Sequence, residues 1–326
     1  MNQCPAITHL LCLPRIRVQN ANAVSSPLTH GFPAMSAFLG LMWALERKAS
    51  EAGVEACFNA VGVVCHQHQE LITEGGFVNA FRLTRNPVDK GGKTAAIVEE
   101  GRMHMEISLL FGVVAEHWRE PETEQSEINA IAELIQTMRV AGGTIQPHDK
   151  PGLYRYRPWA IPQSGSDAAK VFRDARGRML PGSALVLRDD LLDKRFHAIQ
   201  ASDASATRLD AWLSLSRFNW AYQESDAGKG EWRNDRPKGS GWIVPIPVGY
   251  GALSETQAGG SVANARDSET PFRFVESVYS IGEWIGPHRL HDARQMLWYG
   301  QSEPETGLYG CGNDYVAHSA QSTNLD

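Results

Sequence analysis

The chain has 326 residues and a formal net charge of −6, with 42% of its residues hydrophobic and 21% charged. This is the composition of a globular protein that can bury a sizeable core, in one large domain or two small ones. A membrane-spanning helix is not expected, because no apolar run approaches the ~20 residues that cross a bilayer.

The first half of the chain predicts alternating strands and helices. A helix begins near residues 34–36, just after a proline, and its apolar residues recur at helical spacing. The other predicted elements are strands over Leu10–Val18, Phe58–Glu70 and Met103–Val114, a hairpin pairing Phe77–Thr84 with Thr94–Val98, a helix over Glu124–Val140 and a short strand after it. The order β-α-β-hairpin-β-α-β is that of a ferredoxin-like fold, so the sequence predicts an α+β protein.

The second half is less regular. Residues 147–180 are rich in Arg, Pro, Gly and Ser, which predicts a loop-rich insertion. Further predictions are a strand over Leu180–Arg188, a helix over Leu209–Trp220, a polar linker over 223–240 and a strand in GWIVPIPVGY. We therefore expect a palm at 1–146, a basic insertion with a helical segment at 147–240, and strands and a helix at 241–326 that complete the body.

Charge is unevenly distributed along the chain. Residues 96–135 hold nine Glu against two Arg, whereas residues 139–188 hold nine Lys or Arg against three Asp. Such segregation allows one face to hold a polyanion and another a basic partner, although the charge pattern alone favours a solvated acidic helix. The net charge alone counts against nucleic-acid binding.

Few residues form a pattern typical of a catalytic or metal-binding site. His66 and His68 lie two apart, but without a third ligand at a recognisable spacing they favour a half-exposed strand edge over a metal site. Glu99 and Glu100 precede Arg102, where a turn or an ion pair is favoured over acid–base catalysis. No nucleophile or phosphate-loop motif is found. The sequence predicts no catalytic residue, metal or cofactor.

The cysteines and the first residues bear on location. The five cysteines are widely spaced and form no CxxC, which argues against a disulfide framework and fits a reducing cytoplasm. The opening segment has no basic region, so a signal peptide is not expected.

Three polar segments have residue types suited to RNA. Asparagine and arginine offer hydrogen-bonding groups for base edges and phosphates, and an aromatic ring offers a stacking surface. The segments carry Asn20, Asn22 and Phe32 after the first strand, Arg82, Arg85 and Lys93 around the predicted hairpin, and Asn264, Arg266 and Arg273 near the end. Asx turns would equally explain the asparagines, and structural ion pairs the arginines.

Those segments belong to seven stretches, in order from about residue 11 to 309, in which the chain resembles Csy subunit two, the Cas-five-like subunit of type I-F CRISPR surveillance (Cascade) complexes. The stretches are LPRIRVQNANAVSSPLTHGFP, LTRNPVDKGGKTAAIVEEGRMHMEISLLFGV, MRVAGGTI, LPGSALV, GWIVPIPVGYGALS, NARDSETPFRFVESVYSIGEWIGPHR and LWYGQSEPETGLY. The resemblance covers nearly the whole chain.

The resemblance implies a ferredoxin-like palm of the RAMP type with an inserted thumb, a cytoplasmic location and no catalysis. The implied partners are the five-prime handle of the CRISPR RNA, the large Csy subunit in a heterodimer, and the backbone Csy subunits; target DNA would be met only indirectly, and no membrane is involved. The thumb is expected at 75–97, with 147–180 as the other candidate.

The resemblance also orders the expected RNA contacts. Asn20, Asn22, Arg85, Asn264, Arg266 and Arg273 lie in matched stretches and Arg82 directly precedes one, and Arg15, Arg17, Phe32 and Lys93 follow in a second tier. Two alternatives remain open: a ribonuclease of the same fold that uses His66 or His68, and a scaffold that contacts only protein.

Overall fold

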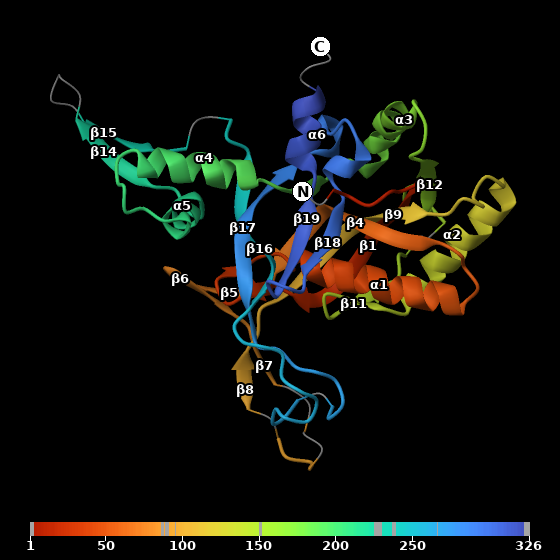
Figure 1. The fold of residues 1–326 in the computed structure, drawn as a ribbon, viewed down its shortest axis with the longest axis horizontal. Coiled ribbons are helices and arrows are strands. Elements are labelled where there is room, and N and C mark those ends of the chain that lie inside the picture. Colours follow the sequence, from red (N-terminus) through yellow and green to blue (C-terminus); the bar gives the residue numbers. More distant parts are fainter. Residues whose placement is uncertain are drawn as a thin grey trace.

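One large antiparallel sheet organises the chain in the computed structural model (Figure 1). The structure describes residues 3–85, 88, 91–94, 96–149, 152–224, 230–236, 239–265 and 267–322. Within them eleven strands join in the order β10-β11-β1-β9-β4-β13-β17-β16-β19-β18, and β12 pairs with β1. None of the described helices is both long enough and apolar enough to cross a membrane.

The first 146 residues follow the predicted order of elements. They contain β1 (His9–Asn22), α1 (Met35–Glu51), β4 (Cys57–Glu70), β9 (Arg102–Val114), α2 (Pro121–Gln136), β10 (Arg139–Val140) and β11 (Gly143–Gln146), with a small ladder of β2 (Val24–Ser26) and β3 (Thr29–His30). Each neighbouring pair in the order β11-β1-β9-β4 is antiparallel. α1 ends where Gly53 takes a φ of +84°, a conformation that glycine adopts without steric cost.

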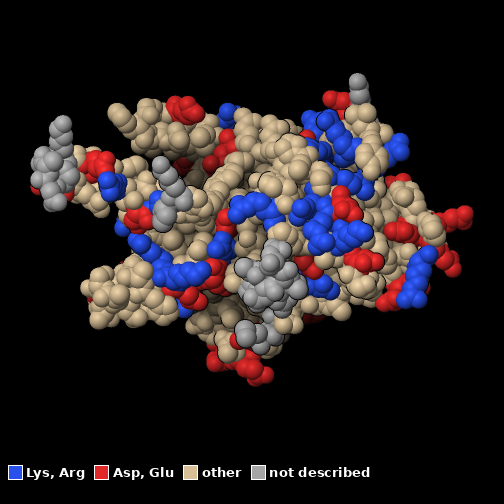
Figure 2. All heavy atoms as spheres, turned by 90° about the horizontal axis from the view of Figure 1, so that it is seen from above, with Lys and Arg blue, Asp and Glu red and all other residues tan. Residues whose placement is uncertain are grey.

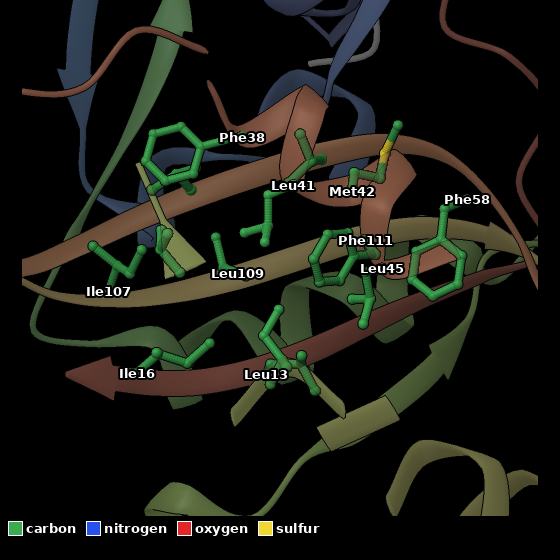
Figure 3. Close-up of a cluster of buried hydrophobic side chains, with 14 of the residues drawn as sticks. Leu13, Ile16, Phe38, Leu41, Met42, Leu45, Phe58, Ile107, Leu109 and Phe111 are labelled. Atoms are coloured by element: carbon green, nitrogen blue, oxygen red, sulfur yellow. The ribbon is translucent and has the colours of Figure 1, made fainter. Parts of the chain in front are cut away.

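The main core lies between α1 and one face of these strands (Figure 3). Alternate residues of each strand point to this face, because side chains alternate across a sheet. α1 supplies Phe38, Met42 and Leu45 at helical spacing, so its apolar stripe meets the apolar face of the sheet. The strands supply Leu13, Ile16, Phe58, Ile107, Leu109 and Phe111, and all of these side chains are buried.

The segment between β4 and β9 differs from the predicted single hairpin. It forms two hairpins in succession, β5 (Ile72–Gly75) with β6 (Val78–Phe81) and β7 (Leu83–Arg85) with β8 (Ile97–Glu99). The predicted strand over Phe77–Thr84 is divided at Arg82 into β6, which pairs back with β5 across the turn at Gly76, and the start of β7. The expected pairing across the NPVDKGGK loop is confirmed only for β7 with β8.

The second half extends the same sheet. β13 (Ser183–Leu187), β16 (Trp242–Ala252), β17 (Val275–Ile285), β18 (Trp298–Glu303) and β19 (Leu308–Asn313) follow β4, and α6 (Tyr315–Ser322) comes last. Because β4 pairs with both β13 and β18, these strands close into a ring. Trp298 is fully buried there, and its indole N–H donates to the carbonyl of Leu185 at 2.8 Å.

The opposite face of the sheet is covered by a second layer. It comprises α3 (Ala168–Ala175) and η2 (Arg176–Met179), with η3 (Pro287–Arg289) and η4 (Ala293–Gln295) beside them. Before them, η1 (Tyr154–Tyr156) leads into β12 (Trp159–Pro162), which pairs with β1 within the sheet. The loop-rich insertion expected at 147–180 is therefore structured. Phe172, Met179 and Trp159 anchor it by packing on the sheet in a second core.

A projecting arm contains the predicted helix over Leu209–Trp220 in shortened form, and a hairpin where part of the polar linker was expected. It holds α4 (Asp189–Gln200), α5 (Arg208–Leu215), and a hairpin of β14 (Trp220–Glu224) and β15 (Gly230–Asn234), seen at the left of Figure 1. The Asn219 side-chain amide donates to the carbonyl of Ser214 at 3.0 Å, so the chain leaves the helix before Trp220. Tyr222 then pairs across the hairpin with Trp232, an aromatic pair that favours strands.

Candidate nucleic-acid interface

The sheet face opposite α1 changes character halfway along β1, β9 and β4. At one end Leu10, Cys12, Ala60, Val64 and Leu110 are buried under the α3 layer. Register shifts at Leu13/Ile16 on β1 and Cys65/Gln67 on β4 mark the boundary. Such bulges bend a strand and redirect its side chains, often beside a functional site.

Beyond the bulges the same face is polar and open. Its side chains line a depression of about 330 Å³. Glu106 pairs in register with Arg17 on one side and Gln67 on the other, and His104 pairs with Gln69. We call this surface the open half of the sheet face; its polar residues are Arg17, Gln19, Gln67, Gln69, His104, Glu106 and Gln146.

Two arginines near this surface play different parts. The Arg15 side chain is only 14% exposed; it contacts Glu106 at 2.7 Å and donates to the carbonyl of Leu180 at 3.0 Å. The Arg17 side chain is 46% exposed, and its contacts with the carbonyl of Pro147 (3.5 Å) and with Asp149 (3.9 Å) are long. Because Arg15 neutralises Glu106, the guanidinium of Arg17 gives the open half its positive charge.

A hydrogen-bonded chain fixes the edge of this surface. The His66 ring contacts the carbonyl of Pro181 through Nδ1 at 2.6 Å and Ser108 Oγ through Nε2 at 2.7 Å. The backbone N–H of Arg15 donates to the same Ser108 Oγ at 3.0 Å. A neutral ring with the proton on Nδ1 satisfies every partner, and burial lowers the pKa of His66 accordingly.

This arrangement bears on the ribonuclease and metal alternatives. Both ring nitrogens of His66 already have partners, so the ring serves structure rather than proton transfer. His68 is exposed. Over the described residues, no three His, Cys, Asp or Glu side chains gather as metal ligands. The predicted ion pair between Arg102 and Glu100 is confirmed at 2.7 Å.

The polar turn after β1 is partly used for local structure. The Asn22 side chain accepts from the N–H of Val24 at 3.1 Å and donates to its carbonyl at 2.7 Å, which is an Asx turn. Asn20 has a φ of +58°, its N–H donates to His104 Nδ1 at 3.2 Å, and its side chain is exposed. Phe32 stacks on Phe38 and is half-buried.

The other predicted contacts lie on separate projecting segments. Arg82 and Lys93 are exposed on the insertion between β4 and β9, and Asn264 is exposed in a turn with a φ of +60°. Arg273 donates to the carbonyl of Ser254 at 3.2 Å, which ties the base of the loop between β16 and β17. The side chain of Arg85 and all of Arg266 lie outside the described residues. In Figure 1 the β7–β8 hairpin and the β16–β17 loop extend to the same side of the body.

Gln67, Gln69 and Gln146 were missed from the sequence. Gln19, Gln67, Gln69 and Gln146 come from three strands and share the open half only because of the pairing register. A detectable signal was the polar run HQHQ at the end of an otherwise apolar strand. Polar residues there indicate a strand that leaves its covering layer.

The charge segregation read from the sequence has a spatial counterpart. Acidic residues lie on and before α2, among them Glu116 and Glu127. The basic stretch packs near α3 and η2, where Arg178 lies over the rings of Trp159 (4.5 Å) and Tyr154 (5.0 Å). Figure 2 shows Lys and Arg gathered over the middle of the upper face, and acidic side chains toward the end occupied by α2 in Figure 1.

The structure thus defines a mixed α/β protein with a large antiparallel sheet, one end of which presents a polar face. A family model described as CRISPR-associated protein (Cas_Csy2) matches residues 11–311. CRISPR-associated protein Csy2 of Pseudomonas aeruginosa (strain UCBPP-PA14) is 41% identical over 311 residues, covering 92% of this chain and 94% of that protein. The chain belongs to the Csy2 family of CRISPR-associated proteins, which confirms the resemblance drawn from its sequence.

Proposed function

We propose that this chain is a non-catalytic RNA-binding subunit of a type I-F CRISPR surveillance complex. In antiviral defence it holds the five-prime handle of the CRISPR RNA together with the large Csy subunit, next to the backbone Csy subunits, in the cytoplasm. Target DNA is met through the RNA rather than read by this chain.

The open half of the sheet face is the observation that carries this proposal. It combines one accessible guanidinium with amide and imidazole groups and has its carboxylate neutralised. Amides hydrogen-bond base edges, and arginine binds phosphate through its planar fork. Such a surface suits a single-stranded RNA better than a protein, because apolar side chains are few on it and most of its groups need hydrogen-bonding partners.

The proposed palm is ferredoxin-like, of the RAMP type. The strand order β11-β1-β9-β4, which is antiparallel throughout, supports this assignment. Along the chain, α1 follows β1 and α2 follows β9, as in that fold. The segment at 75–97 is the proposed thumb, and its β7–β8 hairpin projects from the body (Figure 1). The layer at 147–180 is less suited to a thumb, because Phe172 and Met179 fix it to the sheet.

The test is co-purification with the neighbouring Csy subunits, followed by sequencing of any bound RNA. We expect one short RNA class with a constant five-prime end. A triple variant, Arg17→Ala with Gln67→Ala and Gln69→Ala, should then weaken RNA binding in the assembled complex by at least tenfold, since several charge and amide contacts are removed together.

The matched control is Arg119→Ala. Arg119 is 82% exposed and pairs with Glu116 beside the acidic α2, so its loss should leave RNA affinity unchanged. If the triple variant leaves the RNA affinity of the assembled complex unchanged, the result would support the protein-only scaffold. Cleavage of repeat RNA by the purified chain, abolished by His68→Ala, would support the ribonuclease instead.

A further inference from the structure

A second cavity, of about 310 Å³, adjoins the open half of the sheet face. It lies between the end of β4, the turn before β13, the segment after β3 and the paired strands β16 and β17. Three aromatic rings form its apolar walls: Phe32, Trp242 and Trp284. Its volume is at the lower end of the range for small-ligand pockets, about 300–1,000 Å³.

The aromatic walls are held in place by their neighbours. Trp242 and Trp284 face each other across β16 and β17, with ring centroids 6.2 Å apart and planes at 44°. Phe32 meets Trp284 edge-on at 4.8 Å and is backed by the buried Phe38. Trp242 nevertheless remains 56% exposed. An indole so exposed on a strand, beside two supported rings, offers a stacking surface without needing rearrangement.

The remaining walls are polar but carry no fixed charge. Gln67, His68 and Ser183 supply an amide, an imidazole and a hydroxyl, and none of the described residues that line the cavity carries a carboxylate, guanidinium or ammonium group. His66 also lines it, but both its ring nitrogens are engaged. A phosphate or another ion would find no counter-charge there. A neutral, planar group with a hydrogen-bonding edge fits both the rings and the polar wall.

Position connects this cavity to the proposed RNA surface. Gln67 lines both hollows, so a chain lying over the open half reaches the aromatic walls at its next step. Across the sheet, Glu106 on β9 lies between Gln67 on β4 and Arg17 on β1. A phosphate of the bound chain would therefore lie at Arg17, on the side of the open half away from the cavity. Phosphates fix the register of such a chain, and unstacked bases enter pockets beside it.

We propose that this cavity holds one nucleobase of a single-stranded RNA, turned out of the strand and stacked on Trp242 and Trp284, with Gln67, His68 or Ser183 contacting its edge. The proposal rests on the proposed function and deepens it. It predicts that the base at a single nucleotide position contributes to RNA affinity through this chain's aromatic rings, whereas the neighbouring nucleotides contribute through the open half.

The experiment uses the assembled complex of this chain with its partner subunits. A series of CRISPR RNAs is prepared, each with one abasic nucleotide at a different five-prime position, and their affinities are measured for the wild type, Trp242→Ala and Trp242→Phe. At one position the abasic RNA should bind the wild type roughly tenfold more weakly, the effect of one lost base–aromatic stack. Trp242→Ala should weaken intact RNA by the same factor and show no further loss with that abasic RNA.

Controls separate stacking from folding. Trp242→Phe keeps a ring and should restore most of the affinity. Trp220 on β14 is 58% exposed and lies outside the cavity, so Trp220→Ala should behave as the wild type toward the whole RNA series. The abasic series on the wild type needs no protein substitution, so it tests the pocket even if a variant unfolds.

The outcomes distinguish a failure of the base pocket from a failure of the proposed RNA-binding function. If intact RNA binds and the Arg17, Gln67 and Gln69 triple variant weakens it, but no abasic position couples to Trp242, the base pocket is wrong while the proposed function stands. If neither the triple variant nor Trp242→Ala changes RNA affinity, both fail. Coupling at one position supports both.

Discussion

The two halves of one sheet face differ in chemistry although the same three strands run through both. In the covered half, Leu10, Val64 and Leu110 are fully buried beneath Phe172 and Met179. In the open half, Arg17 and Gln67 take equivalent places on the same strands. The comparison teaches that a strand can be buried under a covering layer at one end and present polar side chains on an open surface at the other, with bulges at the boundary.

The largest expected effect on stability comes from weakening the α3 layer that covers the sheet. Phe172→Ala deletes a fully buried ring between α3 and the sheet, so it should reduce the free energy of unfolding by about 3–5 kcal/mol. Gln19→Ala in the open half should change it by no more than about 0.5 kcal/mol. Denaturant unfolding of both variants measures the contrast. Similar losses for the two would mean that the halves do not differ in their contribution to folding.

The boundary itself should matter next. Arg15→Ala leaves Glu106 without its guanidinium and removes a donor from the carbonyl of Leu180, so we expect a loss of about 2 kcal/mol in the free energy of unfolding. Adding Glu106→Gln removes the stranded charge and should recover part of that loss, a non-additivity that a double-mutant cycle measures. Strict additivity would show that the two side chains act independently.

Arg17→Ala should affect RNA rather than stability. Its half-exposed guanidinium makes only long contacts within the chain, so unfolding should change by no more than about 0.5 kcal/mol. Loss of one phosphate contact should lower the magnitude of the slope of log affinity against log salt by about 0.7 for single-stranded RNA. Salt titrations of the assembled complex give the slope, with Arg119→Ala as the unchanged reference.

The smallest effect concerns pH. Burial lowers the pKa of His66, so its contribution to stability is present above the ordinary histidine value of 6.5 and is lost as the pH falls toward the lowered pKa. Wild-type stability should therefore fall in mild acid, and His66→Gln should flatten that slope. His68→Gln, two residues away and exposed, should keep the wild-type slope. Equal slopes in all three proteins would contradict the half-buried, neutral ring.

Much of the fold could be predicted because its signals are local. The apolar periodicity of Phe38, Met42 and Leu45 requires a helix, and the alternation in β1, β4 and β9 requires strands. The hairpins at 72–99 and the β14–β15 arm were misjudged for the opposite reason. Gly75-Gly76 and Asn219 turn the chain at points where the surrounding residues give no clear period.

The predicted site residues lie in different surroundings. Arg17 lies in the open half, whereas Arg15, Asn22 and Arg273 have side chains occupied by internal contacts. The residue types alone could not separate these cases, because a guanidinium suits a carbonyl as well as a phosphate. The distinction depends on what each side chain touches.

The sequence by itself determined the family, the first half's order of elements and the absence of a recognisable catalytic motif, because these reside in residue identity and short-range spacing. Only the tertiary structure decided that glutamines from separate strands share one surface, that His66 is enclosed, and that Phe32 joins Trp242 and Trp284 around a cavity. Those facts depend on strand register and on contacts between residues as much as 252 positions apart, from Phe32 to Trp284. Sequence periodicity carries no information at that range, since it reports which face a residue occupies and not what lies opposite.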